Sequence, residues 1–341
     1  MPTIVVRDYN ILSNFSDNAE KLSNCAKEHV NADTRFDLIQ KRIERLVEEK
    51  AIICLQEVPQ VWGNRLLTYF YQNDYFFIPS YYSNYVSGRM GVGIAFPRSL
   101  YNLEESHIIT LSDTKKWPSP EIKNTTNLIA NLFTKLKLLF LSFFIKPKVE
   151  TKQEDVWSLA RARVNTTICL KLSVIGEENA KFCISTYHMP CLFKYPAVMM
   201  IHCHLLAKYV QNIAQSTPYI ITGDFNFTPS STCYKYYTSG TVDENSPDCP
   251  VPYPSDDDFD LSSIAPMKSA YHQMLGREPE FTIRAGTQPP FIDTLDYIFY
   301  SSNITPIEVL ALPKEETFTP NAQEPSDHLM IGATFDLITK Q

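Results

Sequence analysis

Short polar clusters, spread over nearly the whole chain, each follow an apolar run with the composition of a β-strand. The side chains of interest in these clusters are Asn10, Glu57, His188, Asp224, Asn226, Asp296, Asp327 and His328. Runs of β-branched and aromatic residues that end in polar turns predict strands. Because loops at strand ends are held by a rigid sheet and commonly carry function, we expect these clusters to form one site assembled from the whole chain.

The order of the expected elements indicates the fold class. Helices are predicted over Thr34 to Lys50, Val61 to Asn73 and Pro196 to Ala214, between strand-like runs. Strands that alternate with helices early, and short strands that recur later, favour a layered α/β fold over a pure sandwich or a helix bundle. Although 341 residues could make two average domains, one large two-sheet domain also fits, and we expect a single domain over residues 1–341.

Residues 115–154 interrupt this pattern and resemble an insertion rather than a domain. Within them, Leu128 to Ile145 is strongly apolar, but Lys135 and Lys137 interrupt it. A helix that spans a membrane needs about 20 mostly apolar residues, so this stretch is a poor candidate. We expect a buried or half-buried helix that ends before Pro147; the alternative is a helix that lies at a membrane interface or covers the substrate.

The formal net charge of -7 restricts how the protein could bind nucleic acid. Binding through a broad basic surface requires clustered Lys and Arg side chains that displace counterions, which an acidic chain does not favour. A nuclease is not excluded, because a site that neutralises a scissile phosphate with a bound cation needs carboxylates.

The eight cysteines form no CxxC pair, and several, such as Cys54, Cys169 and Cys183, lie within apolar strand-like runs. This placement predicts buried, reduced thiols rather than disulfides. The first residues, MPTIVVRDYN, lack the basic and long apolar regions of a secretory signal. We therefore expect an intracellular protein in the cytoplasm, with the nucleus as an alternative, and not a secreted one.

Together, the polar clusters contain the groups that phosphoester hydrolysis requires. Glu57 and a second carboxylate such as Asp327 supply the oxygen ligands that Mg²⁺ prefers, with Mn²⁺ as a substitute. Such an ion would polarise the phosphorus centre. Asp224 is the candidate for orienting or deprotonating the attacking water.

Neutral or protonated donors are needed where charge develops on the phosphoryl oxygens. Asn226, His188 and His328 suit that role. Asp296 could fix the tautomer of His328 by accepting a hydrogen bond from its other ring nitrogen.

Other metal and nucleotide motifs are absent from the sequence. His202 and His204 are two residues apart in an expected helix, so their side chains point to different faces and form no HExxH or CxxC zinc set. No GxxxxGKS/T loop and no GxSxG elbow occurs, which disfavours an NTPase and a serine hydrolase. The acidic run from Asp256 to Asp260 lacks the glycine and the ligand spacing of a calcium loop and is expected to be a solvated loop.

These motifs, in this order, resemble the endonuclease/exonuclease/phosphatase superfamily, which includes DNase I, apurinic endonucleases, inositol polyphosphate phosphatases and sphingomyelinases. The matching segments are DYNIL at 8–12, LQEV at 55–58, GVGIAF at 91–96, STYHMP at 185–190, GDFN at 223–226, LDYIFY at 295–300 and SDH at 326–328. The resemblance implies an α/β fold, a four-layer α/β sandwich of two mixed β-sheets packed face to face with outer helices. It also implies Mg²⁺-dependent cleavage of phosphodiesters or phosphomonoesters.

The resemblance further implies a role for each polar residue. The roles fall into three groups: metal ligands Glu57 and Asp327; substrate-binding residues Asn10, His188 and Asn226; and catalytic residues His188, Asp224, Asn226, Asp296 and His328. Within the catalytic group, Asp224 positions water and Asp296 pairs with His328.

Further motifs narrow the resemblance. KSAY at 268–271, EPEFT at 278–282 and the closing SDH segment look like the branch that contains nocturnin, the Angel proteins, the 2′-phosphodiesterases and the catalytic subunit of the Ccr-Not deadenylase. We therefore expect a 3′ exoribonuclease of the deadenylase type that acts on RNA as a monomer. Tyr271 and Phe281 are aromatic residues that could stack bases.

Three alternatives stay open from the sequence. The acidic charge favours a phosphatase or phosphodiesterase of small nucleotides or 2′,5′-oligoadenylate. The apolar stretch near residue 140 motivates a lipid phosphoesterase, for sphingomyelin or an inositide, with membrane contact. A catalytically dead binding module is the non-enzyme alternative, although all candidate catalytic positions are filled. Because the substrate-binding walls decide specificity, the shared chemistry does not separate these substrates.

Overall fold

The computed structural model describes the chain at residues 2–14, 18–82, 89–117, 155–177, 179–243, 245–251, 259–262, 264–314 and 316–337. The apolar stretch at 128–145, most of the insertion expected at 115–154, and Asp256 to Asp258 lie outside the described residues. The predictions made for those segments therefore stay predictions.

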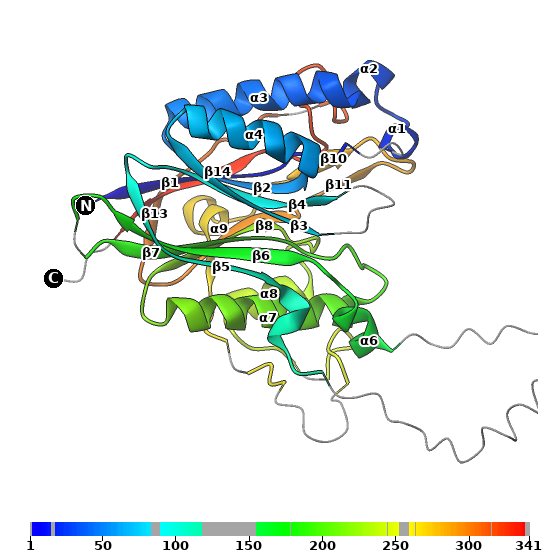
Figure 1. Ribbon diagram of the computed structural model, residues 1–341. Coiled ribbons are helices and arrows are strands. Elements are labelled where there is room, and N and C mark those ends of the chain that lie inside the picture. The colour runs from blue at the N-terminus through cyan, green and yellow to red at the C-terminus, as the bar shows by residue number, and fades with distance from the viewer. Residues whose placement is uncertain are drawn as a thin grey trace, which may run out of the picture.

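Two six-stranded mixed sheets form the centre of the molecule (Figure 1). Sheet A has the order β13 (Thr305–Val309), β14 (Ile331–Asp336), β1 (Thr3–Asn10), β2 (Ile52–Pro59), β4 (Met90–Pro97) and β3 (Tyr75–Tyr82). Sheet B has the order β5 (Tyr101–Thr110), β6 (Thr166–Val174), β7 (Lys181–His188), β8 (Tyr219–Asp224), β12 (Asp296–Tyr300) and β9 (Lys268–Ser269). In each sheet one inner pair is parallel, β1 with β2 and β7 with β8, and the other pairs are antiparallel.

Helices cover the outer face of each sheet (Figure 1). On sheet A these are α3 (Ala32–Glu48) and α4 (Gln60–Gln72), and on sheet B they are α7 (Pro196–Ala214), α8 (Thr232–Ser239) and α6 (Val156–Arg161). The shorter elements are α1 (Asn18–Lys21), α2 (Lys27–Val30), the 3-10 helix η1 (Leu111–Thr114), α9 (Ala270–Leu275) and the hairpin of β10 (Ile283–Ala285) and β11 (Phe291–Asp293). The four-layer α/β sandwich expected from the sequence is confirmed.

Helix α3 illustrates how the sequence produces one of these layers. Its buried side chains, which include Phe36 and Ile39, recur at helical spacing and pack on sheet A. The helix begins two residues before the predicted start. The reason is that the side-chain oxygen of Asn31 accepts the backbone N–H groups of Asp33 and Thr34 and so caps an earlier turn.

The inner faces of the two sheets share one apolar core. Sheet A contributes Val6, Ile52 and Ile94, and sheet B contributes Ile168 and Ile220, all fully buried. Burying a side chain of this size stabilises the fold by about 1.5–3 kcal/mol before conformational entropy is counted. This core holds the sheets face to face, so the ends of their inner strands meet at one edge of the sandwich.

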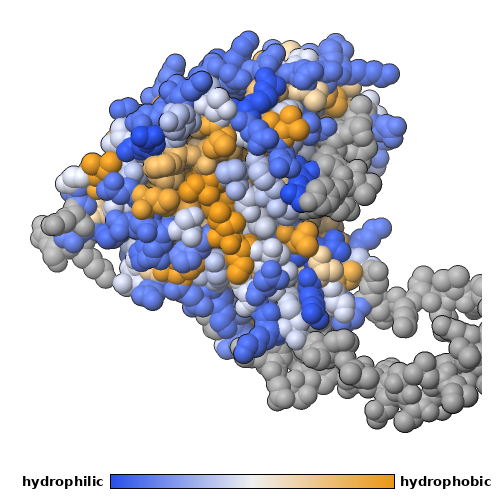
Figure 2. Space-filling model, viewed as in Figure 1, coloured by the Kyte–Doolittle hydropathy of each residue, from blue (hydrophilic) through white to orange (hydrophobic). Residues whose placement is uncertain are grey.

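The sequence analysis predicted neither of the edge strands β3 and β5. β3 contains Pro79, and β5 is exposed over residues 102–106, so neither run has an alternating apolar pattern. In Figure 2, apolar side chains gather in a band across the sheet layers, between hydrophilic surfaces above and below. Exposed Phe76 of β3 and Leu103 and Ile108 of β5 contribute apolar surface on these two strands.

Two predictions from composition can be compared with the fold. Cys54, Cys169 and Cys183 are fully buried, and all eight cysteines lie within the described residues as free thiols, as predicted. Within the described part of the chain, no helix combines the length and the hydrophobicity that crossing a bilayer requires.

Candidate active site

The polar strand ends meet at one edge of the two-sheet core. Asn10, Glu57, His188 and Asp224 lie in the last residues of β1, β2, β7 and β8. Strands β12 and β14 run antiparallel to β8 and β1, so Asp296 at the start of β12, and Asp327 and His328 just before β14, reach the same edge. We call this set the polar edge; its residues are Asn10, Glu57, His188, Asp224, Asp296, Asp327 and His328.

Unusual backbone geometry directs two of the strand ends. Glu57 lies in a bulge of β2, where the pairing with β4 shifts between Leu55 and Val58, and its φ is 54°. Gly223 approaches the neighbouring strand so closely that an added Cβ would lie 1.9 Å from the carbonyl oxygen of Tyr187. The glycine of the GDFN motif is therefore required by the packing of β8 on β7.

Asp224 occupies the middle of the polar edge and is almost fully buried. Its Oδ2 accepts a hydrogen bond from Nδ2 of Asn10 at 2.9 Å and lies 3.6 Å from Nε2 of both His188 and His328. Its Oδ1 accepts the backbone N–H of Asn226 at 2.9 Å. One carboxylate oxygen is thus surrounded by three nitrogen groups from three different strands or loops.

His328 and Asp296 form a buried pair. Nδ1 of His328 lies 2.8 Å from Oδ2 of Asp296, and the Thr282 hydroxyl donates to the same oxygen at 2.5 Å. Burial alone would lower the pKa of His328, but the carboxylates of Asp296 and Asp224 raise it well above its usual value. The ring is therefore held in its charged form, with Nε2–H directed at Asp224.

The orientation of His188 is set from the other sheet. The hydroxyl of Tyr82 on β3 lies 2.8 Å from Nδ1 of His188. Burial raises the pKa of Tyr82 well above its usual value, so the hydroxyl beside Nδ1 stays uncharged. The backbone of His188 is also held, because Nδ2 of Asn165 donates to its carbonyl oxygen at 2.8 Å. Nε2 of the ring is left to face Asp224.

Asn226 and Asn10 fix the loops around Asp224. Nδ2 of Asn226 donates to the carbonyl oxygen of Met189 at 2.9 Å, and the residue has a positive φ of 51°. The backbone carbonyl of Asn10 accepts the hydroxyl of Ser326 at 2.6 Å, which joins the end of β1 to the SDH segment. The side-chain amide of Asn226 and the backbone of Asn10 therefore hold the loops on the two sides of Asp224.

Two carboxylates on the sheet A side have the donor chemistry of a site for a hard cation. Oε2 of Glu57 accepts the N–H of Ser13 at 2.9 Å; burial would raise the pKa of Glu57, but His188 and this N–H outweigh it and lower the pKa. Burial and the negative charge of Glu57 raise the pKa of Asp327 to about 6. Oδ1 of Asp327 is buried and has no hydrogen-bond partner among the described residues. An oxygen-ligated cation such as Mg²⁺ would relieve both the repulsion and the missing partner, so these residues fit it.

A second group of potential ligands fits a metal less well. Asp224, Asp296 and His328 each offer a ligand atom within 4.8 Å of the others. However, Asp296 already accepts hydrogen bonds from His328 and Thr282. This group is therefore better described as a hydrogen-bonded network beside Glu57 and Asp327.

Arg35 is a buried residue of the site that the sequence analysis did not single out. Its guanidinium donates to the carbonyl oxygens of Pro325 at 2.6 Å, Ser13 at 3.1 Å and Ile11 at 2.7 Å, and also contacts that of Leu12. It thereby joins the loop that bonds Glu57 to the loop that carries Asp327. A sequence signal existed: Arg35 precedes Ile39 and Ile43 at intervals of four, on the apolar side of the helix. Thr282 is the last residue of the EPEFT segment at 278–282, which supported the family resemblance, whereas we find no such signal for Tyr82.

One predicted substrate contact is wrong. Tyr271 is buried, and its hydroxyl donates to the carbonyl oxygen of Leu310 at 2.8 Å, so its ring is not available to stack on a base. Phe281 is half-buried and packs near the guanidinium of Arg284. Instead, exposed Phe193 and half-buried Phe291 lie with their ring centres 6.1 Å apart.

Fold and site together define a class of protein: a two-sheet α/β sandwich that presents carboxylates, amides and imidazoles at one edge. The sequence profile of the Endonuclease/Exonuclease/phosphatase family matches residues 9–328, a range that includes the whole polar edge. The chain belongs to this family.

Individual relatives are more distant. The chain is 35% identical over 125 residues to "Carbon catabolite repressor protein 4 homolog 4" of Arabidopsis thaliana, covering 35% of this chain and 27% of that protein. It is 26% identical over 330 residues to "2′,5′-phosphodiesterase 12" of Mus musculus, covering 90% of this chain and 46% of that protein. The chain thus spans less than half the length of these relatives.

Solved structures resemble the fold over nearly the whole chain. ANGEL2, described as a 2′,3′-cyclic phosphatase in complex with adenosine-2′,3′-vanadate, matches with a TM-score of 0.69 and 18% identity. The match covers 98% of this chain and 95% of that one. At this identity the likeness concerns the fold, and function must be argued from the residues of the site.

Proposed function

We propose that the protein is a Mg²⁺-dependent phosphoesterase that cleaves phosphodiester bonds and acts as a 3′ exoribonuclease of the deadenylase type. The observation that carries this proposal is the placement of Oδ2 of Asp224. It lies among Asn10, His188 and His328, beside the two carboxylates of Glu57 and Asp327. Membership of the family supports phosphoester chemistry at this edge.

The proposed roles follow from these contacts. Asp224 orients the attacking water and accepts its proton as the new oxygen–phosphorus bond forms and the ester bond breaks. The charged ring of His328, held by Asp296, and Nε2–H of His188 donate to the phosphoryl oxygens, where negative charge increases. The departing oxygen takes up a proton from water.

The remaining polar residues support binding. Asn10 and Asn226 hold the loops on both sides of Asp224 and offer amide groups to the phosphate. Glu57 and Asp327 would hold Mg²⁺, which supplies charge neutralisation and polarisation of the phosphate when bound.

An aromatic pair favours a nucleotide or RNA substrate over a lipid. Phe193 lies five residues after His188, and Phe291 lies five residues before Asp296, so both rings are close in sequence to the polar edge. Phe193 is 52% exposed, although solvent exposure of a large aromatic side chain is unfavourable. Aromatic faces of this kind bind bases by stacking, each base contributing about 1–3 kcal/mol.

The test uses a 5′-labelled RNA that ends in a run of adenosines. Wild-type protein with Mg²⁺ is expected to shorten it from the 3′ end in single-nucleotide steps, and chelation of the metal should stop the reaction. Glu57→Gln and Asp224→Asn should each lower the rate by about 10³-fold or more. Asp113→Asn, at an exposed carboxylate on η1, is the matched control and should retain full activity. RNA that stays intact with active protein would exclude the exoribonuclease.

A second candidate is a phosphodiesterase of 2′,5′-linked oligoadenylate. The alignment with the mouse relative of that name over 90% of this chain favours it. The same polar edge would perform the reaction, and only the position of the ribose would differ. Parallel rate measurements on 2′,5′-linked and 3′,5′-linked triadenylate distinguish the two candidates, since each predicts the faster reaction for its own linkage.

A further inference from the structure

A second layer of polar side chains lies in the core directly beneath the polar edge. Side chains alternate between the two faces of a strand, so a residue two positions before a polar-edge residue points to the same inner face. Three of the four strand ends have a polar residue at that position, and in β2 the polar residue directly precedes Glu57. We call this set the second polar layer; its residues, all fully buried, are Asp8 on β1, Gln56 on β2, Thr186 on β7 and Thr222 on β8.

Gln56 connects the two sheets within this layer. Its Nε2 donates to Oδ1 of Asp8 at 2.7 Å and to the hydroxyl oxygen of Thr186 at 2.9 Å. Asp8 belongs to sheet A and Thr186 belongs to sheet B. One side-chain amide therefore joins the sheets directly behind Glu57 and His188.

Two oxygen atoms of the second polar layer have no hydrogen-bond partner among the described residues. They are Oδ2 of Asp8 and Oε1 of Gln56. A buried acceptor without a partner is unfavourable, because it has given up its hydrogen bonds to water. Two acceptors cannot bond to each other, but a proton on the carboxyl group turns one of its oxygens into a donor. The same pair of side chains, already joined through Nε2 and Oδ1, would then satisfy both oxygens.

Arg7 and His328, which are cations on or beside β1, already have carboxylate partners. Arg7 points to the opposite face of β1 from Asp8 and pairs with Glu49 at 2.9 Å. The ring of His328 pairs with Asp296 at 2.8 Å. The titratable side chains that face Asp8 from the neighbouring elements are Cys54 on β2, Asp224 on β8, Asp296 on β12 and Tyr271 on α9.

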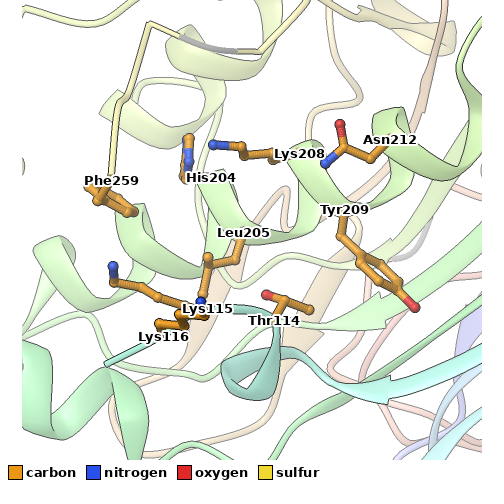
Figure 3. Close-up of a pocket in the computed structure, with 9 residues that line it drawn as sticks. All are labelled: Thr114, Lys115, Lys116, His204, Leu205, Lys208, Tyr209, Asn212 and Phe259. Carbon is orange, nitrogen blue, oxygen red and sulfur yellow. The ribbon is translucent and has the colours of Figure 1, made fainter. Parts of the chain in front are cut away.

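The surroundings of Asp8 favour its neutral form. Burial raises the pKa of Asp8 well above its usual value; the hydroxyl of Thr222 opposes this rise, and the carboxylate of Asp296 adds to it. Lys115, in the cavity between η1 and α7, shows how a charge can be kept at low exposure (Figure 3). Its ammonium group lies 5.6–5.8 Å from the ring centres of Trp117, Trp157 and Phe259, which stabilise a cation. Asp8 lies near other acids instead, so a proton is the simpler way to bury it.

We propose that Asp8 is a neutral carboxylic acid in the folded protein, and that its Oδ2–H donates to Oε1 of Gln56. Asp8 is then a positioning residue, because the acid–amide pair fixes Gln56. That side chain directly precedes Glu57, whose φ is 54°, and bonds to the strand that ends in His188. The protonation of Asp8 does not depend on the proposed function, whereas its positioning role rests on it.

The first test compares urea unfolding of the wild type and Asp8→Asn between about pH 5 and pH 8, with the metal chelated. The asparagine amide can make both bonds of the pair without titrating. In the unfolded chain an aspartate ionises near a pKa of about 3.9, so a proton kept in the folded state makes the wild type less stable as the pH rises. The folding equilibrium constant of the variant relative to that of the wild type should increase about tenfold per pH unit, until Asp8 ionises in the folded protein. A constant ratio over this range would overturn the proposal.

Infrared spectroscopy supplies an independent signal for the proton. A protonated carboxyl group has a C=O stretching band that is separate from the bands of carboxylates and amides. At about pH 6 the wild type should show such a band that is missing from Asp8→Asn, and identical spectra would overturn the proposal. Asp113→Asn, at an exposed carboxylate on η1, is the control for both measurements and should behave as the wild type does.

The positioning role is tested through the affinity for Mg²⁺, measured by calorimetry. Asp8→Leu removes both oxygens and should weaken Mg²⁺ binding by about tenfold, whereas Asp8→Asn should keep the wild-type affinity. Wild-type affinity in Asp8→Leu would overturn the positioning role. Weaker binding by Asp8→Asn would also overturn it, and this outcome does not require Asp8→Leu to fold. If the wild type binds no Mg²⁺, the proposed function fails, while the two tests of the proton keep their meaning.

Discussion

The polar edge and the interior of α7 both contain buried histidines, but the pKa of the histidine is lowered in α7 and raised at the polar edge. In α7, Nδ1 of His202 lies 2.8 Å from the hydroxyl of Tyr187, and Nε2 lies 3.1 Å from the carbonyl oxygen of Ala160. Burial lowers the pKa of His202 to about 4. At the polar edge, His328 faces carboxylates, which raise its pKa. Burial holds both rings in place, but the neighbours decide which one is charged.

The two regions also differ in how completely their polar groups are satisfied. Both ring nitrogens of His202 have partners within the protein. At the polar edge, Oδ1 of Asp327 has none among the described residues, and Glu57 and Asn226 have positive φ angles. Such conformations cost about 1–3 kcal/mol each, and they persist where the surroundings fix them. Unpaired groups and backbone strain together are the properties expected of a ligand site, whereas the α7 interior has the properties of structural packing.

The strongest test of this comparison removes the carboxylate that charges His328. Asp296→Asn keeps the shape of the side chain, but it takes away the negative charge 2.8 Å from Nδ1. We expect the rate of phosphoester hydrolysis to fall by about 10³-fold, because the ring loses its positive charge and its fixed orientation. His202→Gln, measured in the same assay, should change the rate by less than about twofold.

Thermal unfolding of the two variants provides the structural control for this test. If both variants unfold at the temperature of the wild type and Asp296→Asn still hydrolyses substrate at the wild-type rate, the charged state of His328 is not part of the reaction.

A smaller effect is expected from Arg35, which joins the loop that bonds Glu57 to the loop that carries Asp327. Arg35→Lys keeps the positive charge but loses the planar guanidinium group, whose N–H groups donate to the carbonyl oxygens of both loops. The apparent dissociation constant for Mg²⁺, measured by calorimetry, should rise by about tenfold, while the rate at saturating Mg²⁺ changes less. Arg65→Lys on α4 is the control, because its guanidinium lies over the ring of Phe36 at 3.7 Å. Unchanged Mg²⁺ affinity in Arg35→Lys would show that the loops are held by other contacts.

Much of the fold followed from local pattern. Runs that end in Asn10, Glu57, His188 and Asp224 have the composition of inner strands, and all four are strands of the sandwich. The edge strand β5 was not predicted. Its residues are largely polar, and it forms a strand because it pairs with β6, a non-local contact that cannot be recognised from its own sequence. Local sequence therefore identifies the inner strands better than the edges.

For the candidate site, the sequence predicted residue types and the structure added partners. The pairing of Asp296 with His328 was implied by the resemblance, and the two side chains are in contact. Tyr82, the hydrogen-bond partner of His188, lies 106 residues away in the chain and was not foreseen. The roles assigned to Glu57 and Asp327 as metal ligands stay predictions, since a bound ion alone would test them.

The smallest expected effect concerns pH and the α7 interior. The pKa of His202 is about 4 in the folded protein, against 6.5 for an unperturbed histidine. Because the folded value is lower, the stability linked to the neutral ring is fully present above about pH 6.5 and is lost as the pH falls toward 4. Between pH 7 and pH 5 this loss is about 2 kcal/mol in the free energy of unfolding. His202→Gln can keep both hydrogen bonds without titrating, so urea unfolding at the two pH values should show a change smaller by that amount. An identical pH dependence in the variant and the wild type would mean that His202 does not resist protonation, and the contrast with His328 would then not arise from burial.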